Sequence, residues 1–464
     1  MNQTPIPVQT NHNHTNNLYR TVFGSMVSIN NQSIINSITK YLNAYKTVFY
    51  KRSFHNFQIV IIAMLYMQEI RSIKLIYDKF IKKHWNICLN RFYYFLSEKN
   101  FNISELAIAT LGICLKFIPN ELKNHVTIYL IIDDTLQSKF GTKFDCYSKL
   151  FDHTNKNGSS YLSGHCFVSL AIAIPILYNQ KFHYIKIPIQ YKLYDKTKSK
   201  LELAANMVSS VAPTLADYQV IVTCDSWYTK APFLKVIKQF ENIDVIGALR
   251  SDTAMFDINV EPRSGKRGRP RKKGAKIDYH NLKYTEEGKF YISHTKAKVN
   301  ITDDIVYITV TTTDIDKFSS IRLYMSTINP DNIKSFESIS NKDGNELKKT
   351  IFNIYKIRWN IEVIFYQQKT FWSFGNYMVR SKEAIEKYIN LLGVTYSLCI
   401  LLPFINSNLS QYKFASPQEI KYYLSECIAK ELIFDKLLKT LQLAKNISTA
   451  KDVIDFIASH DGVS

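Results

Sequence analysis

The 464-residue sequence has few cysteines, and none of the seven forms a CxxC pair. An odd, scattered set argues against a disulfide framework or a zinc site and indicates a reducing compartment. The first twenty residues are polar and lack the apolar segment of a secretory signal. The longest apolar runs, 59–67 and 391–404, are shorter than the roughly 18 residues that span a bilayer. We therefore expect a cytoplasmic protein with no membrane partner.

Acidic residues are also scarce, because 39 Asp and Glu stand against 59 Lys and Arg, a formal net charge of +20. Such an excess favours a polyanionic partner, nucleic acid before membrane. The length is sufficient for two or three hydrophobic cores.

The segment 355–369 carries the most specific pattern in the chain. At about 100° per residue, Tyr355, Arg358, Glu362 and Lys369 share a helical stripe about 60° wide. An adjacent arc is apolar and predicted to be buried: Ile354, Ile357, Ile361, Ile364 and Phe365. A carboxylate between cations suits a site that binds a metal ion and phosphates together. The ordinary alternative is a solvated charged face with i,i+4 pairs.

Two apolar, β-branched runs end abruptly in aspartate. Residues 128–132 precede Asp133 and Asp134, and residues 220–224 precede Asp225. Both runs are typical of buried strands that deliver an acid at the edge of a sheet. A turn or helix-capping role is the alternative for each aspartate. Because side chains alternate along a strand, only one of Asp133 and Asp134 can join a common site.

Together these features resemble one branch of the insertion-sequence DDE transposases, whose signature is Tyr-x2-Arg-x3-Glu-x6-Lys. In that family the Glu is the third catalytic carboxylate, and the Tyr, Arg and Lys contact the DNA backbone. The resemblance implies a catalytic, metal-binding triad of Asp134, Asp225 and Glu362, with DNA contacts from Tyr355, Arg358 and Lys369. Asp134 is preferred to Asp133 because the first acid of the family directly precedes Thr.

The resemblance also implies an α/β, RNase H-like mixed sheet with flanking helices, interrupted by a β-rich insertion. The predicted regions are a disordered arm (1–30), a helical DNA-binding domain (31–125), a catalytic core (126–250 and 346–405), the insertion (251–345) and a C-terminal helical region (406–464). Strands are expected at 128–132, 166–176, 184–191, 220–224 and 245–249, and helices at 199–210 and 231–240. The C-terminal region could serve dimerisation.

Two further segments are candidate DNA contacts. Residues 73–83 and 87–97, with a break at 84–86, are typical of a helix-turn-helix whose second helix presents Asn90, Arg91 and Tyr94. A plain helical hairpin gives the same pattern. The segment 264–274 holds six cations and no acid, and its Arg267-Gly-Arg269-Pro core resembles an AT-hook. A flexible basic loop that touches phosphates is the alternative.

The function implied by the resemblance is cut-and-paste transposition by a bacterial enzyme. Three carboxylates suit two Mg²⁺ ions, for which Mn²⁺ could substitute. The expected partner is double-stranded DNA, both transposon ends and target, bound by a homodimer. The alternatives are an RNase H-like endonuclease or resolvase without strand transfer, and an inactive DNA-binding protein derived from a transposon.

Overall fold

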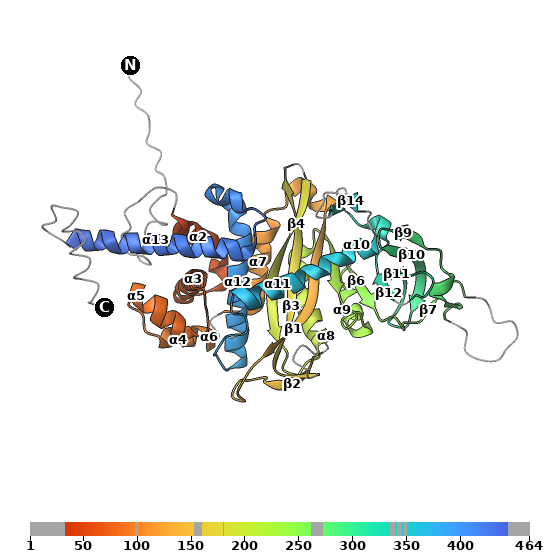
Figure 1. The fold of residues 1–464 in the computed structure, drawn as a ribbon, viewed down its shortest axis with the longest axis horizontal. Helices are drawn as coiled ribbons and strands as arrows, with labels where there is room; N and C mark the ends of the chain where they lie inside the picture. The colour runs from red at the N-terminus through yellow and green to blue at the C-terminus, as the bar shows by residue number, and fades with distance from the viewer. Residues whose placement is uncertain are drawn as a thin grey trace, which may run out of the picture. The chain divides into compact units, whose positions relative to one another are not determined.

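The computed structural model describes residues 33–97, 101–152, 160–179, 181–260, 272–318, 320–334, 339–340, 346–347 and 350–443. The chain divides into two compact units, residues 1–100 with 398–464 and residues 101–397. The N-terminal and C-terminal segments, separate regions in the sequence analysis, thus belong to one unit (Figure 1).

Regular structure in the described part of the first unit is helical. Its elements are α2 (Ile34–Leu42), η1 (Asn43–Val48), α3 (Lys51–Tyr66), α4 (Ile73–Ile76), η2 (Tyr77–Ile81), α5 (Lys82–His84), α6 (Asn90–Ser97), η8 (Ser407–Tyr412) and α13 (Pro417–Leu443). Helix α3 is central to its core, because twelve of its sixteen residues are buried. The carboxylate of Glu431 on α13 accepts hydrogen bonds from the Ser33 hydroxyl and from the Ile34 and Ile35 amides. The Glu431 carboxylate thus caps the N-terminus of α2 and links α2 to α13.

The predicted helix-turn-helix is present as helical elements. Elements α4, η2 and α5 form its first arm, with η2 a single π-helical turn, and α6 forms the second. On α6, Asn90 and Tyr94 are exposed and Arg91 is half-buried. Exposure leaves the two polar side chains accessible to a partner, and their role in DNA reading stays a prediction.

The second unit is built on one large sheet. Its strands are β1 (Thr127–Ser138), β2 (Ser148–Phe151), β3 (Tyr161–Tyr178), β4 (Lys181–Leu193), β5 (Gln219–Cys224), β6 (Ile243–Leu249), β7 (Met255–Phe256), β8 (Lys276–Ile277), β9 (Thr285–Glu287), β10 (Phe290–Val299), β11 (Thr302–Thr312) and β12 (Arg322–Ser326). A separate pair joins β13 (Ile339–Ser340) to β14 (Glu346–Leu347).

The core of this sheet has the order β4-β3-β1-β5-β6. Strands β4, β3 and β1 are antiparallel, whereas β1, β5 and β6 are parallel. Three antiparallel strands followed by two parallel ones form the RNase H-like arrangement, so the predicted fold class is confirmed. All five predicted core strands are present, most of them longer than predicted.

The segment between β6 and α10 extends the same sheet. Strand β12 pairs antiparallel with β6, and β11 and β10 follow it, with β7 and β8 at the end of the order. The β-rich character predicted for this segment is therefore observed, and its strands continue the core sheet through β6.

Helices cover the sheet. They are α7 (Ile103–Leu115), η3 (Asn120–His125), α8 (Lys200–Val211), η4 (Ala212–Leu215), α9 (Ala231–Ile237), η5 (Tyr279–Asn281), η6 (Pro330–Asn332), α10 (Ile351–Tyr355), η7 (Lys356–Arg358), α11 (Trp359–Phe371) and α12 (Lys382–Ile405). Helix α8 packs on β3 and α9, whereas α11 packs on β1 and β4. Figure 1 shows α10 and α11 crossing the strands one after the other.

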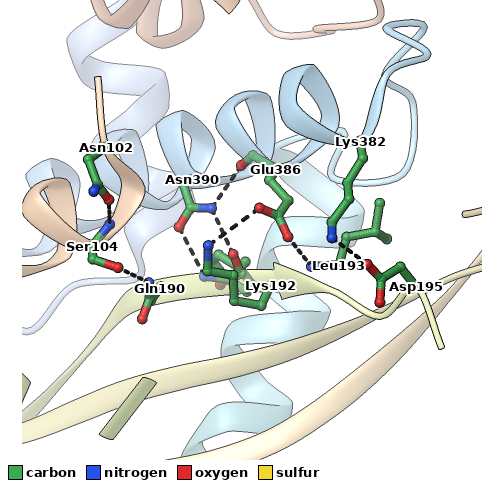
Figure 2. A network of polar contacts seen from close by, with 10 residues as sticks. Asn102, Ser104, Gln190, Lys192, Leu193, Asp195, Lys382, Glu386 and Asn390 are labelled. Atoms are coloured by element: carbon green, nitrogen blue, oxygen red, sulfur yellow. Dashed lines mark hydrogen bonds and ion pairs between the residues drawn. The ribbon is translucent and has the colours of Figure 1, made fainter. Parts of the chain in front are cut away.

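Helix α12 is long and apolar enough to cross a membrane, but 83% of its most apolar window is buried. That burial is typical of the core helix of a globular protein. Its polar side chains are committed to the sheet, as Figure 2 shows. The Asn390 amide accepts from the Tyr191 N–H and donates to the Tyr191 carbonyl, both at 2.9 Å. Glu386 accepts from the Leu193 amide at 2.9 Å.

These contacts satisfy backbone groups of β4 that no neighbouring strand reaches. Tyr191 in turn donates from its hydroxyl to Gln368 on α11 at 2.5 Å. Helix α12 therefore holds β4 in place through Asn390 and Glu386, and β4 holds α11 in place through the Tyr191 hydroxyl.

Replacing Asn390 with Ala should lower the free energy of unfolding of the second unit by about 2–4 kcal/mol, because two buried backbone groups lose their partner. Chemical denaturation followed by circular dichroism measures this loss. The exposed Asn281 is a matched control, and its replacement by Ala should change little. Equal stability of the two variants would contradict the role given to Asn390.

Candidate active site

Asp133 and Asp134 lie within β1, directly after the part of it that pairs with the parallel strand β5, and Asp225 directly follows β5. Strands β1 and β5 are β-branched and buried, as central parallel strands are. Ile132 pairs with Cys224, the last residue of β5, so Asp133 and Asp225 follow at the same level of the sheet. Two acids far apart in the sequence thus come close together.

Asp225 begins a tight turn after β5. Its Oδ1 accepts hydrogen bonds from the amides of Trp227 at 3.0 Å and Tyr228 at 3.2 Å. Burial raises the pKa of Asp225, and the nearby Asp134 carboxylate adds to that shift while the two amides oppose it. The carboxyl group is thus held in place by its own turn.

The signature segment is not one continuous α-helix. Helix α10 ends at Tyr355, residues Lys356–Arg358 form the 3₁₀ turn η7, and α11 begins at Trp359. A 3₁₀ turn advances about 120° per residue, so Tyr355 is displaced from the predicted stripe, whereas Arg358, Glu362 and Lys369 keep α-helical spacing along α11. The predicted apolar arc is confirmed, since all five of its residues are buried: Ile354, Ile357, Ile361, Ile364 and Phe365.

Arg358 joins this segment to the sheet. Its Nη1 binds Asp133 and its Nη2 binds Glu362 at 2.7 Å, and its side chain is only 15% exposed. Burial raises the pKa of Asp133 to about 7; Arg358 opposes the shift, and the Asp225 and Asp134 carboxylates add to it. Arg358 therefore holds Asp133 and Glu362 together, and its charge also opposes the rise that burial causes in the pKa of the nearby Asp225.

Asp134 lies on the other side of the strand, as alternation requires. Its Oδ2 accepts from Lys200 of α8 at 2.7 Å and from the Cys166 thiol at 3.3 Å. Its Oδ1 accepts from the Tyr228 hydroxyl at 2.9 Å. The structure thus pairs Asp133 with the cation that also binds Glu362, and pairs Asp134 with Lys200; which of the two acids is catalytic stays a prediction. The presence of Thr135 after Asp134 does not indicate which face of β1 the signature helix covers.

The remaining predicted contacts lie apart from one another. Lys369 donates to the carbonyl of Leu136 at 2.7 Å, and Leu136 lies three residues beyond Asp133 on β1. The Tyr355 ring packs against Tyr324 with centroids 4.6 Å apart. Arg91 belongs to the first unit, and Arg267 and Arg269 lie outside the described residues.

No three His, Cys, Asp or Glu side chains among the described residues form a group arranged to hold a metal ion. In the present arrangement Arg358 binds Asp133 and Glu362 and Lys200 binds Asp134, and the joint binding of an ion by the three predicted acids stays a prediction. The donor set nevertheless fits a divalent ion. Carboxylate oxygens are the ligands that Mg²⁺ prefers, and the raised pKa values of Asp133 and Asp225 mark a place where added positive charge is favourable.

The sequence analysis missed Lys200, Cys166 and the role of Tyr228. Tyr228 lies three residues after Asp225, a spacing that could have been noticed. Lys200 begins α8, and only the packing of α8 against β3 brings it to Asp134.

An RNase H-like sheet with acids at the ends of its adjacent parallel strands defines a class of enzymes that act on nucleic acid backbones. Residues 51–289, just over half of the chain, match the family model described as DDE superfamily endonuclease. The chain belongs to this family, whose members act on DNA and generally use divalent metal ions. The match includes Asp133, Asp134 and Asp225 and ends before α11. No match to the chain was found among curated proteins.

His165 is a structural residue close to these strand ends. It is fully buried, its Nε2 donates to the Asp145 carbonyl at 2.9 Å, and its Nδ1 accepts from the Tyr377 hydroxyl. The Lys139 ammonium lies 3.5 Å from the centroid of the Tyr377 ring. Burial lowers the pKa of His165 to about 4, and Lys139 adds to the shift. Both ring nitrogens are engaged within the protein.

Acid should weaken the second unit through His165. Its pKa is lowered on folding, so its contribution is fully present above about pH 6.5 and is lost as the pH falls toward 4, at about 1.4 kcal/mol per pH unit. Denaturation of the parent and of His165→Gln at pH 7.5 and pH 5 measures this. The variant should be less stable at pH 7.5 and should lose less stability on acidification. An equal loss in both proteins would show that another group titrates.

Proposed function

We propose that the chain is a DDE transposase that cleaves DNA at the ends of its element and joins the freed 3′-hydroxyl to target DNA. The endonuclease family of the chain supports the cleavage. The spacing of Tyr355, Arg358, Glu362 and Lys369, together with a β-rich segment between Asp225 and Glu362, supports strand transfer.

One observation carries the proposal most directly. Arg358 binds Asp133 and Glu362 at once, so the signature helix is docked at the edge where Asp225 also lies. We therefore assign the first catalytic carboxylate to Asp133 in place of Asp134. Asp133, Asp225 and Glu362 would hold the divalent ions, Mg²⁺ or Mn²⁺. Bound there, two such ions supply activation of the attacking oxygen and stabilisation of the leaving oxygen.

The protein groups around these acids position the DNA. The Nε of Arg358 is buried and has no hydrogen-bond partner among the described residues. Once Arg358 moves from the acids, its planar guanidinium can bind a phosphate through two donors. Lys369 is exposed and carries a charge beside the end of β1, where it can hold the same strand.

DNA contacts farther from the acids complete the proposal. Arg91 on α6 would contact the transposon end, and Arg267 and Arg269 would bind the minor groove or the phosphates of the duplex. Tyr355 would contact a neighbouring phosphate. Cleavage of two ends by one assembly favours a homodimer on DNA.

Asp133→Asn, Asp225→Asn and Glu362→Gln should each reduce cleavage by about a hundred- to a thousandfold, because each removes a charge that the ions require. DNA binding should persist. The assay is cleavage, with Mg²⁺ and with Mn²⁺, of DNA that carries the segments flanking the coding sequence, with a gel shift on the same DNA.

Asp134→Asn is the matched control. Asparagine still offers an oxygen to Tyr228, so cleavage should fall by less than about tenfold. If Asp134→Asn abolishes cleavage while Asp133→Asn retains it, the assignment of Asp133 is wrong and the original choice of Asp134 is restored.

The alternative is a nuclease of the same fold that only cuts. Pre-cut DNA ends with a free 3′-hydroxyl separate the two functions, because a transposase joins them to a target plasmid without further hydrolysis. Joined products that disappear in Glu362→Gln support transposition. Cleavage without joined products supports the endonuclease.

A further inference from the structure

An exposed tryptophan stands beside the acids on the Asp134 side of the sheet. Trp227 follows Asp225 by two residues, and 45% of its surface is exposed. Two lysines lie near its ring: the Nζ of Lys230 lies 4.2 Å from the ring centroid and that of Lys200 lies 5.7 Å away. An aromatic ring next to two cations offers both a flat apolar surface and positive charge to a ligand.

The same groups are tied to two of the acids. Lys200 binds Asp134 at 2.7 Å, and the Trp227 amide donates to Asp225 at 3.0 Å. The backbone of Trp227 is therefore held next to the carboxyl end of β5, and its ring lies near the Lys200 that binds Asp134. Further positive charge lies in the loop between β4 and α8, where Lys196 and Lys198 are exposed.

We propose that Trp227 is a stacking platform for a nucleobase of the DNA strand next to the cleaved bond, with Lys200 and Lys230 binding the adjacent phosphates. This inference rests on the proposed function and adds a nucleobase subsite to it. Every base has a flat π-face, so stacking on tryptophan is tolerant of sequence. Two lysines beside the ring can each pair with a phosphate of a nucleic acid strand.

The ring would act as a positioning group. A base stacked on Trp227 fixes the rotation of the strand about its own backbone, which phosphate contacts alone leave free. Arg358 and Lys369 belong to the segment on the other face of the sheet. A strand that crosses the ends of β1 and β5 would thus be held by its base on one side and by its phosphates on the other.

Binding of two short single-stranded oligonucleotides tests the platform. One is made of thymidines, and the other has the same number of phosphates but abasic sugars. By fluorescence anisotropy, the parent protein should bind the thymidine strand about 5- to 100-fold more tightly than the abasic strand. Trp227→Ala should reduce that ratio toward one, and Trp227→Phe should keep most of it. Lys230→Ala should weaken both strands alike and reduce the salt dependence by about one charge.

Trp359 on α11 is the matched control, since it is 62% exposed. If the preference for thymidine persists in Trp227→Ala and disappears in Trp359→Ala, the platform is elsewhere and the inference is overturned. Equal binding of both strands by the parent protein also overturns it, while the proposed function survives. Failure of the parent to bind either strand, or duplex DNA, contradicts the proposed function itself.

Discussion

The arrangement of the candidate site depends on one buried guanidinium. Arg358 binds Asp133 at the end of β1 and Glu362 on α11, and it does so within a cluster that contains four carboxylates. Without a cation between them, neighbouring buried carboxylates repel one another and favour their neutral forms. Removing Arg358 would leave the negative charge of Asp133 and Glu362 uncompensated. Breaking a buried ion pair in this way destabilises a protein more than replacing both partners by apolar residues. The same position is where a divalent ion would stabilise the acids.

The second cation, Lys200, has the corresponding role on the other face, where it binds Asp134. Four acids and two cations leave an excess of negative charge at the strand ends. In the proposed function, divalent ions would replace Arg358 at Asp133 and Glu362, and Arg358 could then bind a phosphate of the DNA. The helix that carries Glu362 is meanwhile held by Tyr191 through Gln368, and Tyr191 by Asn390. The chain thus supports the site from α12 through β4 to α11.

Much of this architecture could be predicted from local patterns. The apolar runs before Asp133 and Asp225 identified two central strands, and the spacing of Ile354, Ile357 and Ile361 identified the buried side of the signature segment. The 3₁₀ turn at Lys356–Arg358 could not be predicted, because a single helical period fits the same residues almost as well. Alternation showed that Asp133 and Asp134 point apart, but which of them faces α11 depends on packing across the sheet. The contacts of Lys200 and Cys166 with Asp134 likewise arise between segments distant in sequence.

The central claim is that the ends of β1 and β5 and the start of α11 share one metal site. Iron(II) can replace the native ion, and with ascorbate and oxygen it generates radicals that cut the polypeptide near the bound metal. Mass spectrometry of the fragments then locates the site in the intact protein bound to DNA. The account predicts three groups of cuts, near Asp133, near Asp225 and near Glu362, all suppressed by an excess of Mg²⁺. Cuts confined to other segments, or cuts near the aspartates that never include α11, would contradict it.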